Sequence, residues 1–236
     1  MKILDLSQEL SCKMPIFPQD PDFLIKEILN SEKDDFTLSI LNMGLHAGTH
    51  LDSPYHFYSS GRKVLEIPLD ELMGPVKIIE VETNFIDHSY VSNSNRKIHD
   101  PGFEIKASNF KNIKKGDIVI IKTGWSFKWG LDNYFTENPY LSAEAADFLV
   151  EREIRGLAID GPSVDPFGKT LIHKKLLFND IWIVENLKNL ELIPQLDNKD
   201  SNENYNENND SLEFFLIPLP LKSEASPVRA FARIKE

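Results

Sequence analysis

Three histidines and one aspartate lie close together in the segment HAGTHLDSPYHF, residues 46–57. The chain has six histidines in all, so half of them fall within this one segment. Neutral imidazole nitrogen and carboxylate oxygen are ligands that zinc and similar divalent ions take, and a catalytic site keeps a position open for water. His46, His50 and Asp52 could therefore supply three ligands to one metal ion.

The residues around these ligands favour a turn followed by a helix. Gly48 permits a backbone turn between the two histidines, and Asp52 or Ser53 followed by Pro54 predicts a helix start with a capping side chain. That start would direct His56 back toward the open side of the metal, where it could act as an acid or base. The alternative is that these are surface or core histidines beside a helix cap, with no role in metal binding. A serine hydrolase fits less well, because no GxSxG elbow surrounds Ser53.

A second candidate for metal ligation lies in HKKLLFNDIWIVENL, residues 173–187. A short helix followed by a returning strand can bring His173 and Glu185 together, and this pair would suit a second divalent ion. The alternative of a surface histidine and an exposed glutamate stays open on these residues alone. We expect His88 and His99, in polar sequence, to be surface residues.

The composition of the chain limits what its partners can be. With 236 residues and no evident linker, we expect one domain over 1–236. A formal charge of −11 without a basic stripe argues against nucleic acid and favours a small-molecule substrate. The single Cys12 excludes an intrachain disulfide, and the first residues lack a secretory signal, so we expect a cytoplasmic protein. No run approaches the ~20 apolar residues that cross a bilayer.

Apolar, β-branched runs recur along the chain and predict strands mixed with a few helices. This pattern indicates an α/β or α+β class with a mixed sheet or barrel. The polar segment 195–211 predicts a surface loop. We expect helices at Ser142–Glu153 and Leu171–Phe178, and strands at Lys2–Leu6, Leu24–Leu29, Phe36–Met43, Val76–Val81, Asp117–Lys122, Gly156–Ile159, Ile181–Val184, Phe214–Ile217 and Val228–Ile234.

Five separated segments resemble one known family. HAGTHLDSPYHF resembles the HxGTHxDxPxHF signature of the metal-dependent cyclase family, which includes bacterial kynurenine formamidases and isatin hydrolases. The other matches occur in the family's order: DLSQELSCKMPIFPQDP from residue 5, KKGDIVIIKTGW at 114–125, DGPSVDP at 160–166 and SPVRAFA at 226–232. The chain departs from the family pattern in turns and loops, where Asn179 and Asp180 stand at positions at which glycine is common.

This resemblance implies a set of metal ligands. His46, His50 and Asp52 would bind one ion, and Asp52, His173 and Glu185 would bind a second in formamidase-like members, with Asp52 as the bridge. Some relatives use only the first site.

The resemblance also implies a catalytic residue, a fold and an assembly. His56 matches the family's catalytic histidine. The implied fold is an α/β, swivelling β/β/α domain with a central mixed β-barrel and peripheral helices. Family members form dimers or tetramers in which neighbouring chains help to shape the substrate pocket.

The leading hypothesis is an arylformamidase that converts N-formyl-kynurenine to kynurenine and formate. A divalent ion, Zn²⁺ first and Mn²⁺ as the alternative, lowers the pKa of its bound water from 15.7 toward ~7, so that hydroxide can attack the amide carbonyl. His56 would then move the proton to the leaving nitrogen. Candidates for an apolar wall against an aromatic substrate are Phe17, Tyr55, Phe57 and Trp125.

Two other functions remain open. One is hydrolysis of a cyclic amide, imide or lactone such as isatin. The other is a non-catalytic protein stabilised by its ions, which four protein ligands on each ion would favour.

Overall fold

The computed structural model describes residues 1–81, 102–194 and 212–235. The predictions for His88, His99 and the segment 195–211 lie outside these residues. The helices are α1 (Ala143–Glu151) and α2 (Leu171–Phe178), with short 3-10 helices η1 (Pro54–His56), η2 (Val64–Glu66), η3 (Leu69–Glu71), η4 (Ala107–Asn109), η5 (Trp125–Lys128) and η6 (Leu190–Leu192).

Seven strands close into a mixed β-barrel. Their order is β12-β11-β5-β7-β9-β10-β4, and β4 pairs back onto β12 to close the ring. Strands β5, β7, β9 and β10 run parallel, whereas the other neighbours are antiparallel. The expected barrel is therefore confirmed. Its strands are β4 (His50–Asp52), β5 (Met73–Glu80), β7 (Ile118–Lys122), β9 (Gly156–Ile159), β10 (Trp182–Glu185), β11 (Leu212–Pro218) and β12 (Ala225–Ile234).

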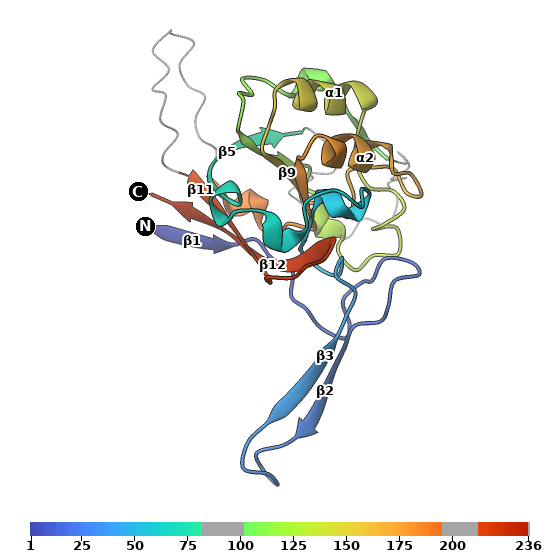
Figure 1. Cartoon of the computed structure of the whole chain (residues 1–236), viewed down its shortest axis with the longest axis vertical. Helices are drawn as coiled ribbons and strands as arrows, with labels where there is room; N and C mark the ends of the chain where they lie inside the picture. The colour runs from blue at the N-terminus through green and yellow to red at the C-terminus, as the bar shows by residue number, and fades with distance from the viewer. Residues whose placement is uncertain (82–101, 195–211, 236) are drawn as a thin grey trace, which may run out of the picture.

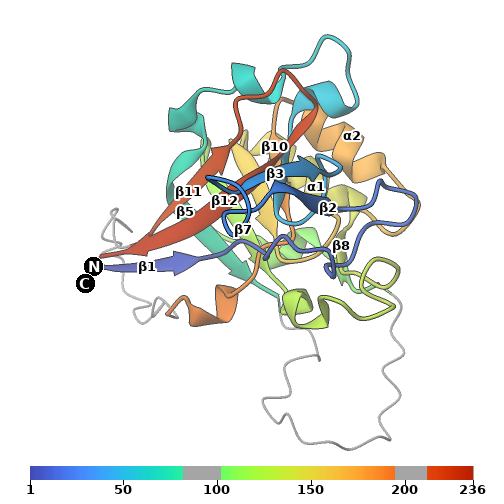
Figure 2. The ribbon, with the colours of Figure 1, turned by 90° about the horizontal axis from the view of Figure 1, so that it is seen from below.

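Other strands extend or flank the barrel. Strand β1 (Lys2–Asp5) pairs with the end of β12, so these two segments lie side by side in both views (Figures 1 and 2). Strands β2 (Leu24–Leu29) and β3 (Leu38–Asn42) form a hairpin that projects away from the body (Figure 1). Strands β6 (Glu104–Ile105) and β8 (Tyr140–Leu141) form a short parallel pair.

The apolar residues of the parallel strands serve two cores. Along β7, Ile118 and Ile120 join a cluster with Trp182, contributed by strands all around the barrel. Val119 and Ile121 belong to a second cluster, which includes residues of α1 and α2. Side chains alternate across a strand, so the first cluster fills the barrel and the second packs the helices onto its outer wall. Because both faces of these strands are buried, their sequences are continuous runs of apolar residues.

The predicted elements agree with the structure except at the shortest ones. Every predicted strand overlaps an observed strand, and Ser142 caps α1 by accepting a hydrogen bond from the Ala145 amide. The predicted helix at Pro54 is a single 3-10 turn, and its predicted side-chain cap is wrong, because Ser53 Oγ instead donates to the Glu224 carbonyl. Asp180, where the family has glycine, adopts φ +61°, a left-handed conformation that Asp tolerates.

Among the residues that the structure describes, no helix is long and apolar enough to cross a bilayer.

The pairing of β9 with β10 makes a prediction about stability. A Cβ atom at Gly156 would lie 2.1 Å from Cε2 of Trp182, its fully buried cross-strand partner. We expect Gly156→Ala to lower the free energy of unfolding by about 2 kcal/mol or more, since the indole has no room to shift. Chemical denaturation followed by circular dichroism measures this change. Gly44→Ala is the control, because its Cβ would make only ordinary contact, and equal stability of the two variants would contradict the expectation.

Candidate metal centre

The pairing of β4 with β10 places three polar side chains on the outer wall of the barrel. His50 and Asp52 alternate along β4 and therefore point to the same face, while Leu51 between them joins the barrel interior. Glu185, the last residue of β10, is the direct cross-strand partner of His50 and so shares its face. All three polar side chains are buried, in the layer between the barrel and α2.

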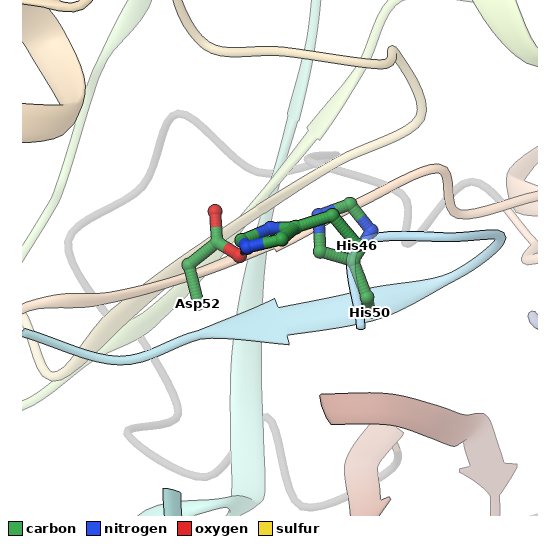
Figure 3. A group of neighbouring side chains, drawn as sticks. All are labelled: His46, His50 and Asp52. Carbon is green, nitrogen blue, oxygen red and sulfur yellow. Dashed lines mark ion pairs between the residues drawn. The ribbon is translucent and has the colours of Figure 1, made fainter. Parts of the chain in front are cut away.

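Two further histidines reach this face from other elements. His46, in the loop before β4, has its Nδ1 atom 2.9 Å from Asp52 Oδ1. His173, in the first turn of α2, has its Nε2 atom 3.0 Å from Glu185 Oε1 and 3.5 Å from Asp52 Oδ2. Figure 3 shows His46, His50 and Asp52 gathered beside β4.

These five side chains form two overlapping groups of possible ligands. His46, His50 and Asp52 offer ligand atoms within 4.8 Å of one another, and so do Asp52, His173 and Glu185. Asp52 is the residue common to both groups. The structure thus brings together all five residues that the sequence singled out as ligands.

Each of the two most buried imidazoles is held by its Nδ1 atom. His50 Nδ1 donates to the Gly48 carbonyl at 2.9 Å. His173 Nδ1 lies 2.7 Å from Asp165 Oδ2. Nε2 of both rings is then directed at the carboxylates of Asp52 and Glu185, at 3.0 to 3.5 Å. Outer partners of this kind orient the histidines of metal sites.

The charges in this layer favour a cation. Burial alone would raise the pKa of Asp52, but His46 and His50 hold it well below its usual value. Burial likewise opposes ionisation of Glu185, whose pKa is nevertheless lowered by His173. Burial would lower the pKa of His50, yet Asp52 and Glu185 raise it to about 9. Two ionised carboxylates are therefore kept away from water and neutralised only by imidazoles.

The donors present fit a divalent metal ion. Asp52 Oδ1 is buried and has no hydrogen-bond partner among the described residues, although His46 Nδ1 lies 2.9 Å away as an ion-pair contact. A buried carboxylate oxygen without a donor is costly unless a cation occupies its lone pair. Imidazole nitrogens and carboxylate oxygens in both groups match the preferences of Zn²⁺ and Mn²⁺.

Comparison with known proteins agrees with this geometry. The family model described as "Putative cyclase" matches residues 4–166, more than half of the chain. The chain belongs to this cyclase family. It is 29% identical to the kynurenine formamidase of Bacillus anthracis over 98% of this chain and 97% of that protein. The kynurenine formamidase of Bacillus mycoides is also 29% identical, over 98% and 96% of the two chains.

Solved structures of similar proteins share the fold. Isatin hydrolase A from Labrenzia aggregata superposes with a TM-score of 0.79 at 23% identity, covering 100% of this chain and 94% of that one. A potential metal-dependent hydrolase with cyclase activity gives a TM-score of 0.70 at 25% identity, covering 98% of each chain.

In this member of the cyclase family, His56 lies beside both groups of ligands without belonging to either. Its ring centroid is 4.4 Å from that of His46 and 6.3 Å from that of His173. Burial lowers the pKa of His56, with Asp52 opposing the shift, so the ring is neutral at neutral pH and can accept a proton. It is placed at the end of η1, the single turn that Pro54 begins.

The four aromatic residues predicted to form an apolar wall lie in different surroundings. Phe57 packs against His56, with ring centroids 4.5 Å apart. Phe17 is partly exposed and contacts two other rings, Phe135 at 5.4 Å and Phe167 at 5.7 Å.

The other two aromatic residues have different contacts. The Tyr55 ring lies beneath the Lys63 ammonium. The Trp125 indole is buried and donates a hydrogen bond to the Tyr134 carbonyl.

Asp165 is a site residue that the sequence reasoning passed over. Its carboxylate accepts hydrogen bonds from the backbone amides of Ile172 and His173, and so caps α2 as well as holding the His173 ring. This replaces the missing side-chain cap at Thr170. The signal was present, since Asp165 is the second aspartate of the DGPSVDP segment.

We expect Asp165→Asn to weaken divalent-metal binding by about 10–100-fold, because the amide cannot hold the His173 ring and the helix start as the carboxylate does. Competition with a chromophoric chelator measures the affinity for Zn²⁺. Asp147→Asn is the matched control, since Asp147 is exposed on α1 and pairs only with Lys175 in the described residues. Equal Zn²⁺ affinity of both variants and the wild type would remove Asp165 from the site.

Proposed function

We propose that this chain is a metal-dependent amide hydrolase that converts N-formyl-kynurenine to kynurenine and formate. Kynurenine formamidases similar over nearly their whole length support this activity. The observation that carries the proposal is the place of His56, a neutral imidazole beside two candidate ligand groups and outside both. A non-catalytic protein that is only stabilised by its metal ions would not need a neutral histidine such as His56 beside them.

Five residues would hold the metal. His46, His50 and Asp52 would bind one ion, and His173 and Glu185 would bind a second together with Asp52. An ion in this place supplies Lewis-acid activation of water and of the substrate carbonyl. The contacts of Nδ1 in His50 and His173 leave their Nε2 atoms as the nitrogens that would hold the metal.

His56 would move the proton. As water oxygen bonds to the formyl carbon, a ring nitrogen of His56 accepts the proton that the water loses. When the carbon–nitrogen bond breaks, His56 returns this proton to the leaving aryl nitrogen. The products are the aromatic amine and formate, and no covalent enzyme intermediate is required.

Aromatic side chains would bind the ring of the substrate. Phe57, beside His56, and the partly exposed cluster of Phe17, Phe135 and Phe167 are the candidates. An apolar wall with few polar groups is typical of sites for aromatic ligands.

The main alternative is hydrolysis of a cyclic amide, imide or lactone. The likeness of the fold to an isatin hydrolase favours it as the second candidate. A cyclic substrate would use the same ligands and the same proton transfer, but the leaving nitrogen or oxygen would stay attached to the product.

Further parts of the proposal concern the metal, the assembly and the location. Zn²⁺ is the first candidate and Mn²⁺ the second, because both accept nitrogen and oxygen donors.

We propose a single domain that forms a homodimer in the cytoplasm. The exposed leucines and isoleucines of the hairpin support assembly, since an isolated two-stranded hairpin is only marginally stable.

We expect His56→Ala to retain metal but to lower kcat by about 10²–10⁴-fold, the usual contribution of a positioned acid or base. Metal content by mass spectrometry and hydrolysis of N-formyl-kynurenine are measured on the same preparation. His50→Ala is the comparison, because it should lose metal as well as activity. Unchanged turnover in His56→Ala would remove His56 from the mechanism.

The substrate is tested by removing metal with a chelator, restoring Zn²⁺ or Mn²⁺, and assaying N-formyl-kynurenine, isatin and a simple lactone. We expect the highest kcat/KM with N-formyl-kynurenine, no activity after chelation, and recovery on reconstitution. A preference for isatin would support the alternative. Inactivity of the reconstituted protein on all three substrates would overturn the formamidase proposal.

A further inference from the structure

The side chain of Asn186 lies behind the loop that carries the first ligand group. Its Nδ2 atom donates to the Gly48 carbonyl at 2.9 Å. The same carbonyl accepts the hydrogen bond from His50 Nδ1, also at 2.9 Å. One backbone oxygen therefore joins Asn186 to the ring of His50, and the position of that oxygen fixes the orientation of the ring.

The backbone of Asn186 is fixed on two sides. Its amide donates to the Gly161 carbonyl at 2.8 Å, and its carbonyl accepts from Thr49 Oγ1 at 2.8 Å. It adopts φ +61° directly after Glu185, a left-handed conformation that Asn tolerates better than most residues. Gly48 is also left-handed, at φ +68°. The two turns are joined by the hydrogen bonds from Asn186 Nδ2 to the Gly48 carbonyl and from Thr49 Oγ1 to the Asn186 carbonyl.

Tyr134 determines which way the Asn186 amide points. The Tyr134 hydroxyl donates to Asn186 Oδ1 at 2.8 Å, so the Nδ2 atom is left to face Gly48. Tyr134 is fully buried, and burial raises its pKa well above the usual value, with Asp160 and Glu185 adding to the shift. The phenol therefore stays neutral and remains a donor at neutral pH.

We propose that Asn186 and Tyr134 are positioning residues for His50. Tyr134 orients the Asn186 amide, the amide holds the Gly48 carbonyl, and the carbonyl holds Nδ1 of His50, so that Nε2 is the nitrogen left to bind a metal ion. The inference rests on the ligand role of His50 in the proposed function. It assigns to two buried residues outside both ligand groups a part in the affinity for the metal.

The test measures Zn²⁺ affinity by competition with a chromophoric chelator, and needs no substrate. Asn186→Gly removes the amide and retains a residue that tolerates positive φ. Tyr134→Phe removes one hydroxyl and leaves the ring in place. We expect the affinity to fall about 10–100-fold in Asn186→Gly, as for other outer partners of metal-bound histidines. In Tyr134→Phe we expect a fall of about three- to tenfold, since one neutral hydrogen bond is lost.

The double variant separates positioning from general loss of stability. If Tyr134 acts through Asn186, then adding Tyr134→Phe to Asn186→Gly should leave the Zn²⁺ affinity of the single Asn186→Gly variant unchanged. Ser142→Ala is the control, because it removes the cap of α1 and lowers stability, and no hydrogen bond joins the Ser142 side chain to the ligand loop or β10 in the described structure. Its Zn²⁺ affinity should equal that of the wild type.

Three results would overturn the proposal. The first is a wild-type Zn²⁺ affinity in both Asn186→Gly and Tyr134→Phe. The second is a loss of Zn²⁺ affinity in Ser142→Ala as large as the loss in these two variants. The third is a double variant in which the two losses of Zn²⁺ affinity add. If Asn186→Gly does not fold, as judged by circular dichroism, the comparison of Tyr134→Phe with Ser142→Ala decides alone. If the wild-type protein binds Zn²⁺ but hydrolyses neither N-formyl-kynurenine, isatin nor the lactone, the proposed activity is wrong. The role of Asn186 and Tyr134 in metal binding is unaffected by that result.

Discussion

The register between β4 and β10 is the constraint on which the rest of the site depends. This antiparallel pairing helps to close the barrel, and it sets Glu185 opposite His50. Because side chains alternate along a strand, a slip of one residue would turn Leu51 outward and the ligand side chains into the barrel. The apolar cluster that receives Leu51 therefore also holds the candidate ligands on the outer wall.

The five candidate ligands are charged or polar groups buried between the barrel and α2. Burying charged groups away from water lowers the stability of the fold unless the charges are neutralised. Asp52 and Glu185 face imidazoles from β4, α2 and the loop before β4. Segments far apart in the sequence, β4 with its preceding loop on one side and α2 with β10 on the other, thus meet at two carboxylates. A divalent ion satisfies the same oxygens more completely than imidazoles do, so metal binding and the packing of α2 onto the barrel are expected to support each other.

Much of this arrangement could be predicted from the sequence, for physical reasons. The strands of the barrel were predictable because burial on both faces requires continuous apolar runs, as in β7. The ligand residues were predictable because His46, His50 and Asp52 are close in sequence, but joining them to His173 and Glu185 depended on resemblance to a family. Local patterns did not predict β4, which has only three residues, two of them polar. Tyr134 and Asn186 act through contacts of long sequence separation, and no local spacing indicates such contacts.

The central claim is that the carboxylate of Asp52 serves both ligand groups. Metal content after loading with Zn²⁺ and gel filtration tests it most directly, in the wild type and in Asp52→Asn, which keeps the shape of the side chain but removes its charge. We expect the wild type to retain metal and the folded Asp52→Asn variant to retain none. Undiminished metal content in that variant would contradict the account.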